Sequence, residues 1–280
     1  MKNKIFQIYY SEATQLQNDP GFIPLDNLAN ERPDWREYWP IRNYLLNNQL
    51  DEDTRYGFLS PKFEAKTTLN AQNVKDFIAD DDESDVILFS PYFEQVAFNF
   101  NVFEHLETAH PGSLIVAQEC LRILRPEVNI YSLIMDSSNT VFCNYFIANN
   151  KFWRIWLTYC EVIFNIAERN DTKLAKSLNT FVDYDGVETT MKVFIIERIA
   201  SFILATNTDI KVKSYNSMEI PLSDQFWERF NNQLCTLDSL KKRFRNKSNV
   251  KYALEFEKIR IEILGKIRDE VESRKNFSQI

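Results

Sequence analysis

Charged and aromatic side chains are concentrated in residues 32–43, RPDWREYWPIRN. An aromatic plane can stack on a nucleotide base, and Arg42 and Asn43 can donate hydrogen bonds to ribose or phosphate oxygens. The alternative is a buried aromatic helix whose arginines pair with Glu37 and Asp34. The segment therefore predicts either part of a nucleotide site or an ion-paired core helix.

A second candidate lies where a short strand ends. Arg55–Leu59 (RYGFL) has the composition of a strand, and Ser60-Pro61 ends it because proline cannot donate to a ladder. Ser60 and Lys62 would then bring a hydroxyl and an ammonium to the sheet edge. Lys62 could neutralise a diphosphate there, although an ordinary surface lysine beside a turn is the simpler interpretation.

Other loops are expected at the same edge. The apolar strand Asp85–Phe89 also ends in Ser-Pro, at Ser90-Pro91. In a doubly wound sheet, Ser11-Glu12 and Asp26-Asn27 would lie in loops of the same edge. Open α/β sheets bind ligands at the carboxyl edge of their strands. We therefore expect these loops to converge on one cleft.

Two positions are candidates for acid–base chemistry. His110 stands before Pro111-Gly112 at a predicted helix start, where a histidine can exchange a proton near neutral pH and anions are favoured. Glu197-Arg198 interrupts an apolar helix, where an unpaired charge is costly to bury. Structural hydrogen bonding of His110, and pairing of Glu197 with its neighbours, are the alternatives.

The metal-ligating side chains are sparse. Asp80–Glu83 contains D-x-D spacing that suits a divalent cation, but such a run is more often a solvated loop. The two histidines and four dispersed cysteines show no zinc-site spacing. No metal ligand is assigned, and reduced thiols are expected.

The elements that must position these residues alternate between strands and helices. Apolar periodicity and turn residues predict an α/β domain over residues 1–206 and a helical C-terminal extension over 207–280. The long helix of that extension is expected to pack a stripe of Leu254, Ile261, Leu264, Ile267 and Val271 on the body. The expected strands are 4–10, 55–59, 85–89, 129–135 and 140–148, and the expected helices begin at 34, 73, 113, 151, 191 and 250.

Composition excludes several classes of protein. With 44% hydrophobic and 14% aromatic residues the chain is too apolar to be disordered, and its net charge of −7 argues against nucleic acid as a partner. No apolar stretch is long enough to span a membrane. Five glycines and the absence of G-x-G-x-x-G or a P-loop disfavour dehydrogenases and P-loop enzymes. A cytoplasmic protein is expected, and peripheral membrane association stays open.

Taken together, several segments resemble one family. The segments IFQIYYSE, DWREYWPIRN, RYGFLSPKF, DVILFSPYF, HPG, VFCNYFIANNKFW and KVFIIERIASFIL resemble the GT-A-like bacterial glycosyltransferases of capsule and lipopolysaccharide gene clusters. The likeness covers roughly residues 4–206. It implies a GT-A, Rossmann-like sheet with helices on both faces that binds a nucleotide-sugar and a glycan acceptor.

The resemblance also assigns roles to residues. It implies donor contacts from Tyr10, Asp26, Arg42, Asn43, Ser60 and Lys62, with Asn144 and Glu197 near the sugar or acceptor. His110 or Glu197 would act as the catalytic base. The sequence lacks the D-x-D at the end of a buried strand that metal-dependent members carry, so the need for manganese or magnesium stays open. The rival hypothesis is a non-catalytic protein that binds a partner through residues 207–280.

Overall fold

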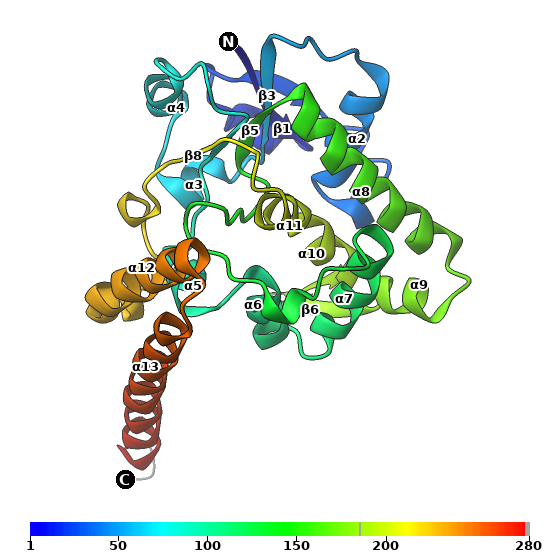
Figure 1. The fold of residues 1–280 in the computed structure, drawn as a ribbon. Coiled ribbons are helices and arrows are strands. Elements are labelled where there is room, and N and C mark those ends of the chain that lie inside the picture. Colours follow the sequence, from blue (N-terminus) through cyan, green and yellow to red (C-terminus); the bar gives the residue numbers. More distant parts are fainter. Residues whose placement is uncertain (185, 278–280) are drawn as a thin grey trace.

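A mixed six-stranded sheet surrounded by helices forms the body of the protein (Figure 1). The computed structural model describes residues 1–184 and 186–277. The sheet contains β1 (Lys2–Tyr9), β2 (Ile23–Asp26), β3 (Thr54–Leu59), β4 (Val86–Leu88), β5 (Phe146–Asn149) and β8 (Val212–Ser214). A separate hairpin is formed by β6 (Phe181–Tyr184) and β7 (Val187–Thr190). The α/β class expected from the sequence is confirmed.

The strand order is β2-β1-β3-β5-β4-β8. β5 runs antiparallel to both of its neighbours, and the other five strands share one direction. The chain leaves β1 for β2 on one side and then returns to β3 on the other side. The carboxyl ends of β1 and β3 therefore flank a topological switch point, the place where open α/β sheets bind ligands.

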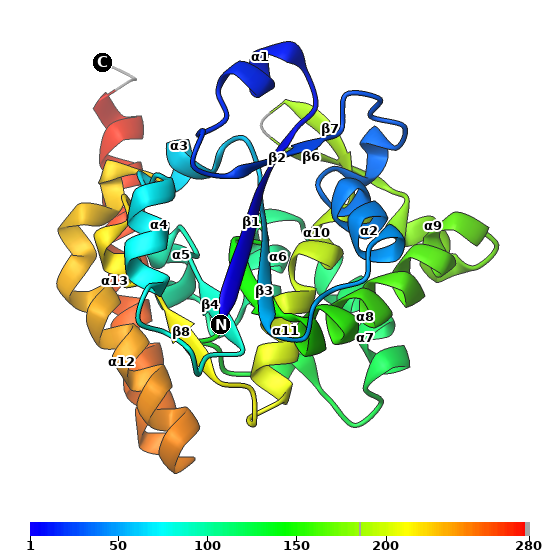
Figure 2. The same ribbon diagram turned by 90° about the horizontal axis from the view of Figure 1, so that it is seen from above.

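Residue alternation along the strands separates two cores. Phe58 of β3 and Leu88 of β4 face the larger core, whereas Leu59 and Ile87 face the smaller one. Successive strand side chains point to opposite faces, so both faces of these strands need an apolar cover. Helices supply that cover on each side, and Figure 2 shows them arranged around β1 and β3.

The helices divide between the cores as follows. The larger core is covered by α2 (Tyr38–Asn47), α6 (Val102–Ala109), α7 (Ser113–Leu124), α8 (Asn150–Arg169), α9 (Lys173–Leu178), α10 (Met191–Glu197) and α11 (Ile199–Thr206). The smaller core is covered by α3 (Phe63–Thr67) and α4 (Ala71–Ile78). A third cluster joins α5 (Phe93–Phe98), α12 (Asn231–Lys247) and α13 (Val250–Phe277). The short α1 (Glu12–Leu16) and the 3-10 turns η1 (Pro33–Trp35), η2 (Ile130–Ser132), η3 (Ser217–Glu219) and η4 (Gln225–Phe230) complete the chain.

Three segments differ from the elements predicted for them. The expected strand 140–148 is a strand only from Phe146, as β5, because Cys143 and Asn144 have positive φ values and form a turn before it. The expected strand 129–135 contains the 3-10 turn η2, because the Asn129 side chain accepts a hydrogen bond from the Tyr131 amide and favours a turn. The expected helix 191–206 is divided at Arg198 into α10 and α11. The Arg198 guanidinium donates to the carbonyls of Phe194 and Val102, which satisfies the buried charge at the break.

The C-terminal region is tied to the body by a strand as well as by helices. β8 lies within residues 207–280 and pairs with β4, so the sheet includes part of the expected extension. The stripe predicted to pack inward on α13 is wrong for Leu254, Ile261 and Leu264, which are exposed, and correct for Ile267, which packs partly buried against the third cluster. Phe256 and Ile263 are the buried residues of the helix. The Val271 side chain lies outside the described residues. Among the described helices, none combines the length and apolar character needed to cross a membrane.

Candidate functional site

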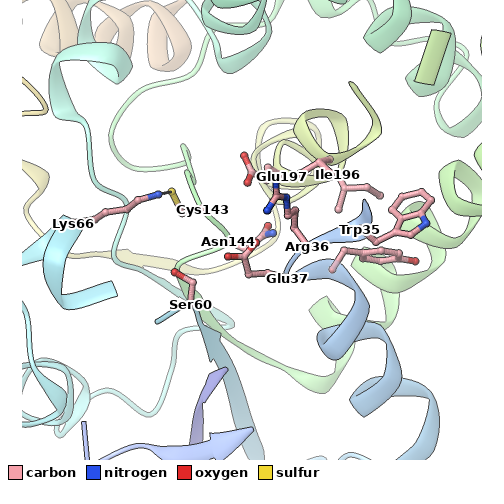
Figure 3. A pocket seen from close by; sticks show the side chains of 11 residues that line it. Trp35, Arg36, Glu37, Ser60, Lys66, Cys143, Asn144, Ile196 and Glu197 are labelled. Atoms are coloured by element: carbon pink, nitrogen blue, oxygen red, sulfur yellow. Dashed lines mark hydrogen bonds between the residues drawn. The ribbon is translucent and has the colours of Figure 1, made fainter. Parts of the chain in front are cut away.

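A pocket opens at the carboxyl edge of the sheet, beside the switch point (Figure 3). It contains about 380 Å³ of empty space, including its mouth. Ser60 enters it directly after β3, and Asn144 enters from the loop that leads into the antiparallel β5. The complete lining is Trp35, Arg36, Glu37, Tyr38, Ser60, Lys66, Cys143, Asn144, Val193, Ile196 and Glu197.

Charges of both signs converge on this pocket. Arg36 and Glu37 come from the turn between η1 and α2, Lys66 from α3, and Glu197 from the end of α10. Figure 3 shows Arg36, Glu37 and Glu197 gathered together, with Lys66 further along the cavity. Such an arrangement can neutralise an anionic ligand and also supply a carboxylate for proton transfer.

Glu197 is the carboxyl group best suited to acid–base chemistry. Burial raises its pKa, the neighbouring Arg198 guanidinium opposes that rise, and Glu37 adds to it. Arg198 lies 3.8 Å from the Glu197 carboxylate but directs its donors to backbone carbonyls. Glu197 is therefore both paired and directed into the pocket, which combines the two alternatives that the sequence left open.

Lys66 presents a cation beside the half-buried thiol of Cys143. Its Nζ lies 3.2 Å from Cys143 Sγ and 5.8 Å from the centre of the Tyr92 ring. Burial opposes the charge of Lys66, but its surroundings, Cys143 first and Tyr145 next, raise its pKa overall. Burial raises the pKa of Cys143 to about 11, against the effect of the Lys66 charge. At neutral pH the pair is consequently an ammonium and a neutral thiol.

Asn144 has an unsatisfied oxygen in this pocket. The residue is 3% exposed, and no donor among the described residues lies within hydrogen-bonding distance of its Oδ1. A buried carbonyl oxygen without a partner costs free energy, so a ligand that donates a hydrogen bond there would be favoured. The observation points to a hydroxyl or amide on the ligand.

The backbone around the pocket is strained. Cys143 and Asn144 have φ values of 59° and 55°, and Arg36 has a φ of 49°. Residues other than glycine rarely adopt this left-handed region, and such strain accumulates where a functional geometry is held by its surroundings. Three strained residues line this one pocket, which supports its identification as the functional site.

A second pocket adjoins the first through Arg36. It contains about 660 Å³ of empty space and lies against the β6–β7 hairpin. The Arg36 guanidinium donates to Thr189 Oγ1 at 3.1 Å, so the same side chain lines both spaces. Phe181 contributes an aromatic ring that is 64% exposed, and Glu188 supplies a carboxylate. The two pockets share this one side chain, and both are included in the candidate site.

The structure brings three of the predicted site residues together. Ser60, Asn144 and Glu197 all line the first pocket. The Ser60 hydroxyl lies 2.6 Å from the Tyr145 hydroxyl, which orients it, and it also accepts from the Lys62 amide at 3.3 Å. Of the four loops expected to converge on one cleft, only the loop at Ser60 lines this pocket. The loops at Ser90-Pro91, Asp26-Asn27 and Ser11-Glu12 are not among its lining residues, and the Ser90 hydroxyl instead accepts a hydrogen bond from the Phe142 amide.

Arg42 and Asn43 lie elsewhere. The Arg42 guanidinium binds the Glu161 carboxylate of α8, and its plane lies 4.3 Å from the centre of the Phe164 ring. Asn43 is on α2, where its carbonyl accepts from Asn47. Arg42 is therefore an ion-paired residue of a core helix, the second of the two interpretations of segment 32–43. Its partner is Glu161, not the expected Glu37 or Asp34.

The remaining donor candidates border the same edge outside the pocket lining. Lys62 is exposed at the start of α3. Tyr10 follows β1 and is 40% exposed, and Asp26 ends β2, where its carboxylate accepts from the Leu28 amide. Their positions would allow contact with a ligand that extends beyond the pocket.

His110 lies at the end of α6, with its ring 4.5 Å from that of Phe194. It is not among the described residues that line either pocket. The start of α7 is occupied by the protein's own anion, because the Glu107 carboxylate accepts from the amides of Gly112 and Leu114 at 2.8 Å. The backbone amides that were expected to bind an anionic ligand at this helix start are therefore already bonded to Glu107.

The acidic run 80–83 stands before β4, at the amino end of that strand. Asp81 is an ion-pair partner of the buried Arg55 at 3.2 Å and accepts from Ser84. Within residues 1–184 and 186–277, no group of three histidine, cysteine, aspartate or glutamate side chains is placed to hold a metal ion. The structure accordingly assigns the run a structural role.

Sequence reasoning missed four residues of the pocket as ligand contacts. Arg36 and Glu37 belong to segment 32–43, and the high density of charged residues in that segment is the sequence feature that could have identified them as site residues. Lys66 and Cys143 had no local signal, since only tertiary packing brings α3 and the β5 loop together.

Comparison of the chain with protein-family models, with curated proteins and with solved structures gave no match in any of the three searches.

Proposed function

We propose that the protein transfers a sugar from a nucleotide-activated donor to a glycan acceptor of a capsule or lipopolysaccharide. The observation that carries the proposal is the pocket at the carboxyl edge of the sheet, where two cations, two carboxylates and the unsatisfied Asn144 oxygen converge. A GT-A-like nucleotide-sugar fold is part of the proposal. It places the donor at the switch point beside β1 and β3.

In this proposal the donor diphosphate lies between Lys66 and Arg36. The leaving diphosphate gains negative charge as the glycosidic bond breaks, and fixed cations stabilise that charge without reorganising. Lys66 is held beside Cys143 and stays protonated, and Arg36 is oriented by Thr189. The nucleoside would extend along the edge towards Tyr10 and Asp26, which end β1 and β2.

Glu197 acts as the base for the acceptor hydroxyl. As the acceptor oxygen bonds to the anomeric carbon, its proton passes to the Glu197 carboxylate and the diphosphate leaves with the bonding electrons. Asn144 Oδ1 accepts a hydrogen bond from a sugar hydroxyl, and the Ser60 hydroxyl offers a second polar contact. These contacts orient the anomeric carbon towards the base.

The acceptor occupies the second pocket. Sugars expose apolar C–H faces as well as hydroxyls, so a pocket with one aromatic ring and several polar groups suits them. Phe181 supplies the ring, and Glu188 and Thr189 supply polar groups. Arg36 lines both pockets and so places the acceptor next to the donor.

Two lysines of one segment provide a controlled test. We expect a nucleoside diphosphate, screened from the common series, to raise the melting temperature of the wild-type protein. Lys66→Met should abolish that shift, whereas Lys62→Met, which removes an exposed lysine four positions earlier, should preserve it. Equal loss in both variants, or no stabilisation by any nucleotide with or without manganese, would contradict the proposed donor site.

Glu197→Gln separates binding from chemistry. The substitution keeps the shape of the side chain and removes its basicity, so nucleotide stabilisation should persist while release of nucleoside diphosphate from the bound sugar nucleotide falls by about 100-fold or more. His110→Gln is the matched variant for the other predicted base. If His110→Gln loses turnover and Glu197→Gln keeps it, the assignment of the base is wrong.

A further inference from the structure

The C-terminal helix α13 carries two apolar faces. One face packs into the third core cluster, where Phe256 and Ile263 are each 1% exposed. The other face contains Leu254, Ile261 and Leu264, which are 65%, 64% and 43% exposed. Single exposed apolar residues are ordinary, but a regular row of them on one helix indicates an interaction surface.

The spacing of the outer row is that of a coiled coil. Positions 250, 254, 257, 261, 264 and 268 are separated alternately by four and three residues, the repeat that keeps side chains on one seam of a paired helix. Val250 is the first of these positions and is also exposed. The two polar members of the row carry opposite charges, Glu257 and Arg268. Its apolar members are left uncovered by their own chain. Arg268 is exposed, and the Glu257 side chain is 38% exposed and pairs with Arg260 of the same helix at 2.8 Å.

We propose that α13 pairs with α13 of a second copy of this chain, antiparallel, about a two-fold axis that passes between residues 262 and 263. That axis places Ile261 opposite Leu264 of the second copy, and Glu257 opposite Arg268 of the second copy. A surface of this kind is complementary to itself, as a two-fold interface requires. A parallel pair would instead place Glu257 against Glu257 and Arg268 against Arg268. The charges select the antiparallel arrangement.

The surroundings of the seam favour a protein partner over a membrane. Exposed charges of both signs alternate around the outer part of α13, at Lys251, Glu255, Lys258, Glu262 and Lys266. A helix that lies on an anionic membrane has a predominantly basic polar face, which α13 lacks. Figure 1 shows α13 projecting from the body, so its outer row is accessible to a second copy. The axis also lies close to the middle of α13, which makes the overlap of two helices nearly complete.

Sedimentation equilibrium of the full chain tests the pairing. The wild-type protein should dimerise as its concentration rises, and Ile261→Asp should remain monomeric with an unchanged melting temperature, because Ile261 is outside the core. Leu16→Asp is the matched control, since it alters an apolar residue that is 87% exposed at a distant site, and it should dimerise normally. A wild-type monomer at every concentration, or an Ile261→Asp dimer, overturns the proposal.

Charge reversal tests the orientation. Arg268→Glu places like charges opposite each other and should weaken dimerisation by about tenfold or more. Combining it with Glu257→Arg restores opposite charges and should recover most of the affinity. Failure of the double variant to recover, with both variants folded by circular dichroism, would overturn the antiparallel register. Cosedimentation of wild-type protein with phosphatidylserine vesicles without any self-association would assign the seam to a membrane instead. These measurements do not involve sugar transfer and are independent of the proposed function.

Discussion

The Arg42 guanidinium binds both oxygens of the Glu161 carboxylate, with Nε 2.5 Å from Oε1 and Nη2 2.9 Å from Oε2. The pair joins α2 to α8, two helices that cover the larger core, and Tyr38 donates to the same carboxylate at 2.6 Å. Burial would raise the pKa of Glu161, but the hydrogen bonds from Arg42 and Tyr38 hold it below its usual value. A residue that resembled a nucleotide ligand is thus part of the packing between helices.

We predict that Arg42→Ala lowers the free energy of unfolding by about 1–3 kcal/mol, because a partly buried charged hydrogen bond is lost. Nucleotide stabilisation should remain. Arg154→Ala is the control on α8: Arg154 and Glu52 are 2.9 Å apart but 70% and 72% exposed, so its effect should stay below about 1 kcal/mol. Urea unfolding measures both. Loss of nucleotide binding in Arg42→Ala would return this residue to the donor site.

The Arg55–Asp81 pair should control stability in acid. Burial alone would raise the pKa of Asp81, but hydrogen bonds from Ser84 and the Arg55 guanidinium lower it to about 2. An unfolded aspartate titrates near pH 3.9, as a general value. The stabilisation is therefore present above about pH 4 and is lost as the pH falls towards 2, an effect of about 2 kcal/mol. In the Asp81→Asn variant, the free energy of unfolding should depend less on pH in that window. Asp80 is exposed, so the Asp80→Asn variant should keep the pH dependence of the wild-type protein.

Two substitutions separate the two roles of Asn144. Asn144→Gly tolerates the left-handed backbone and removes the side chain, whereas Asn144→Ala also introduces strain of about 1 kcal/mol. We expect both variants to lose affinity for the donor sugar, and only Asn144→Ala to lose stability. Thermal unfolding with and without a nucleotide-sugar gives both readouts. If a folded Asn144→Gly protein keeps its full affinity for the donor, the Asn144 Oδ1 of the wild-type protein does not contact the donor.

Cys143 should react slowly with alkylating reagents. With its pKa raised to about 11, its thiolate fraction at pH 8 is small, and labelling by iodoacetamide should be at least about 100-fold slower than for a free cysteine. Lys66→Met removes the charge that opposes this rise, so the reaction should slow further. Mass spectrometry of peptides at timed intervals measures the rate. Rapid labelling of Cys143 in folded protein would contradict a neutral thiol beside the Lys66 ammonium.

Phe181→Ala should affect the acceptor and leave the donor unaffected. Removing an aromatic surface from the second pocket should raise the acceptor KM by about tenfold, while hydrolysis of the donor without acceptor stays unchanged. Phe181→Tyr keeps the ring and should preserve the KM. The comparison requires initial rates at varied acceptor concentration. A parallel fall in donor hydrolysis would show that the hairpin serves the donor pocket or the fold instead.

The sequence by itself determined the elements whose signals are local. The period of apolar residues predicted α7 over Ser113–Leu124, and short β-branched and aromatic runs placed β1, β3 and β4 to within a few residues. The Ser-Pro exit after β3 also pointed correctly to Ser60 as a pocket residue. These signals need only neighbouring residues, because backbone geometry repeats every two or 3.6 positions.

Only the tertiary structure decided which charged side chains meet. Glu161 follows Arg42 by 119 residues, and no spacing rule relates them. On α13 two apolar rows fitted helical periodicity, and the inner row was determined by Phe256 fitting against the α5–α12 cluster. A side chain's partner depends on how distant elements pack, and packing is a property of three-dimensional shape that local periodicity does not contain.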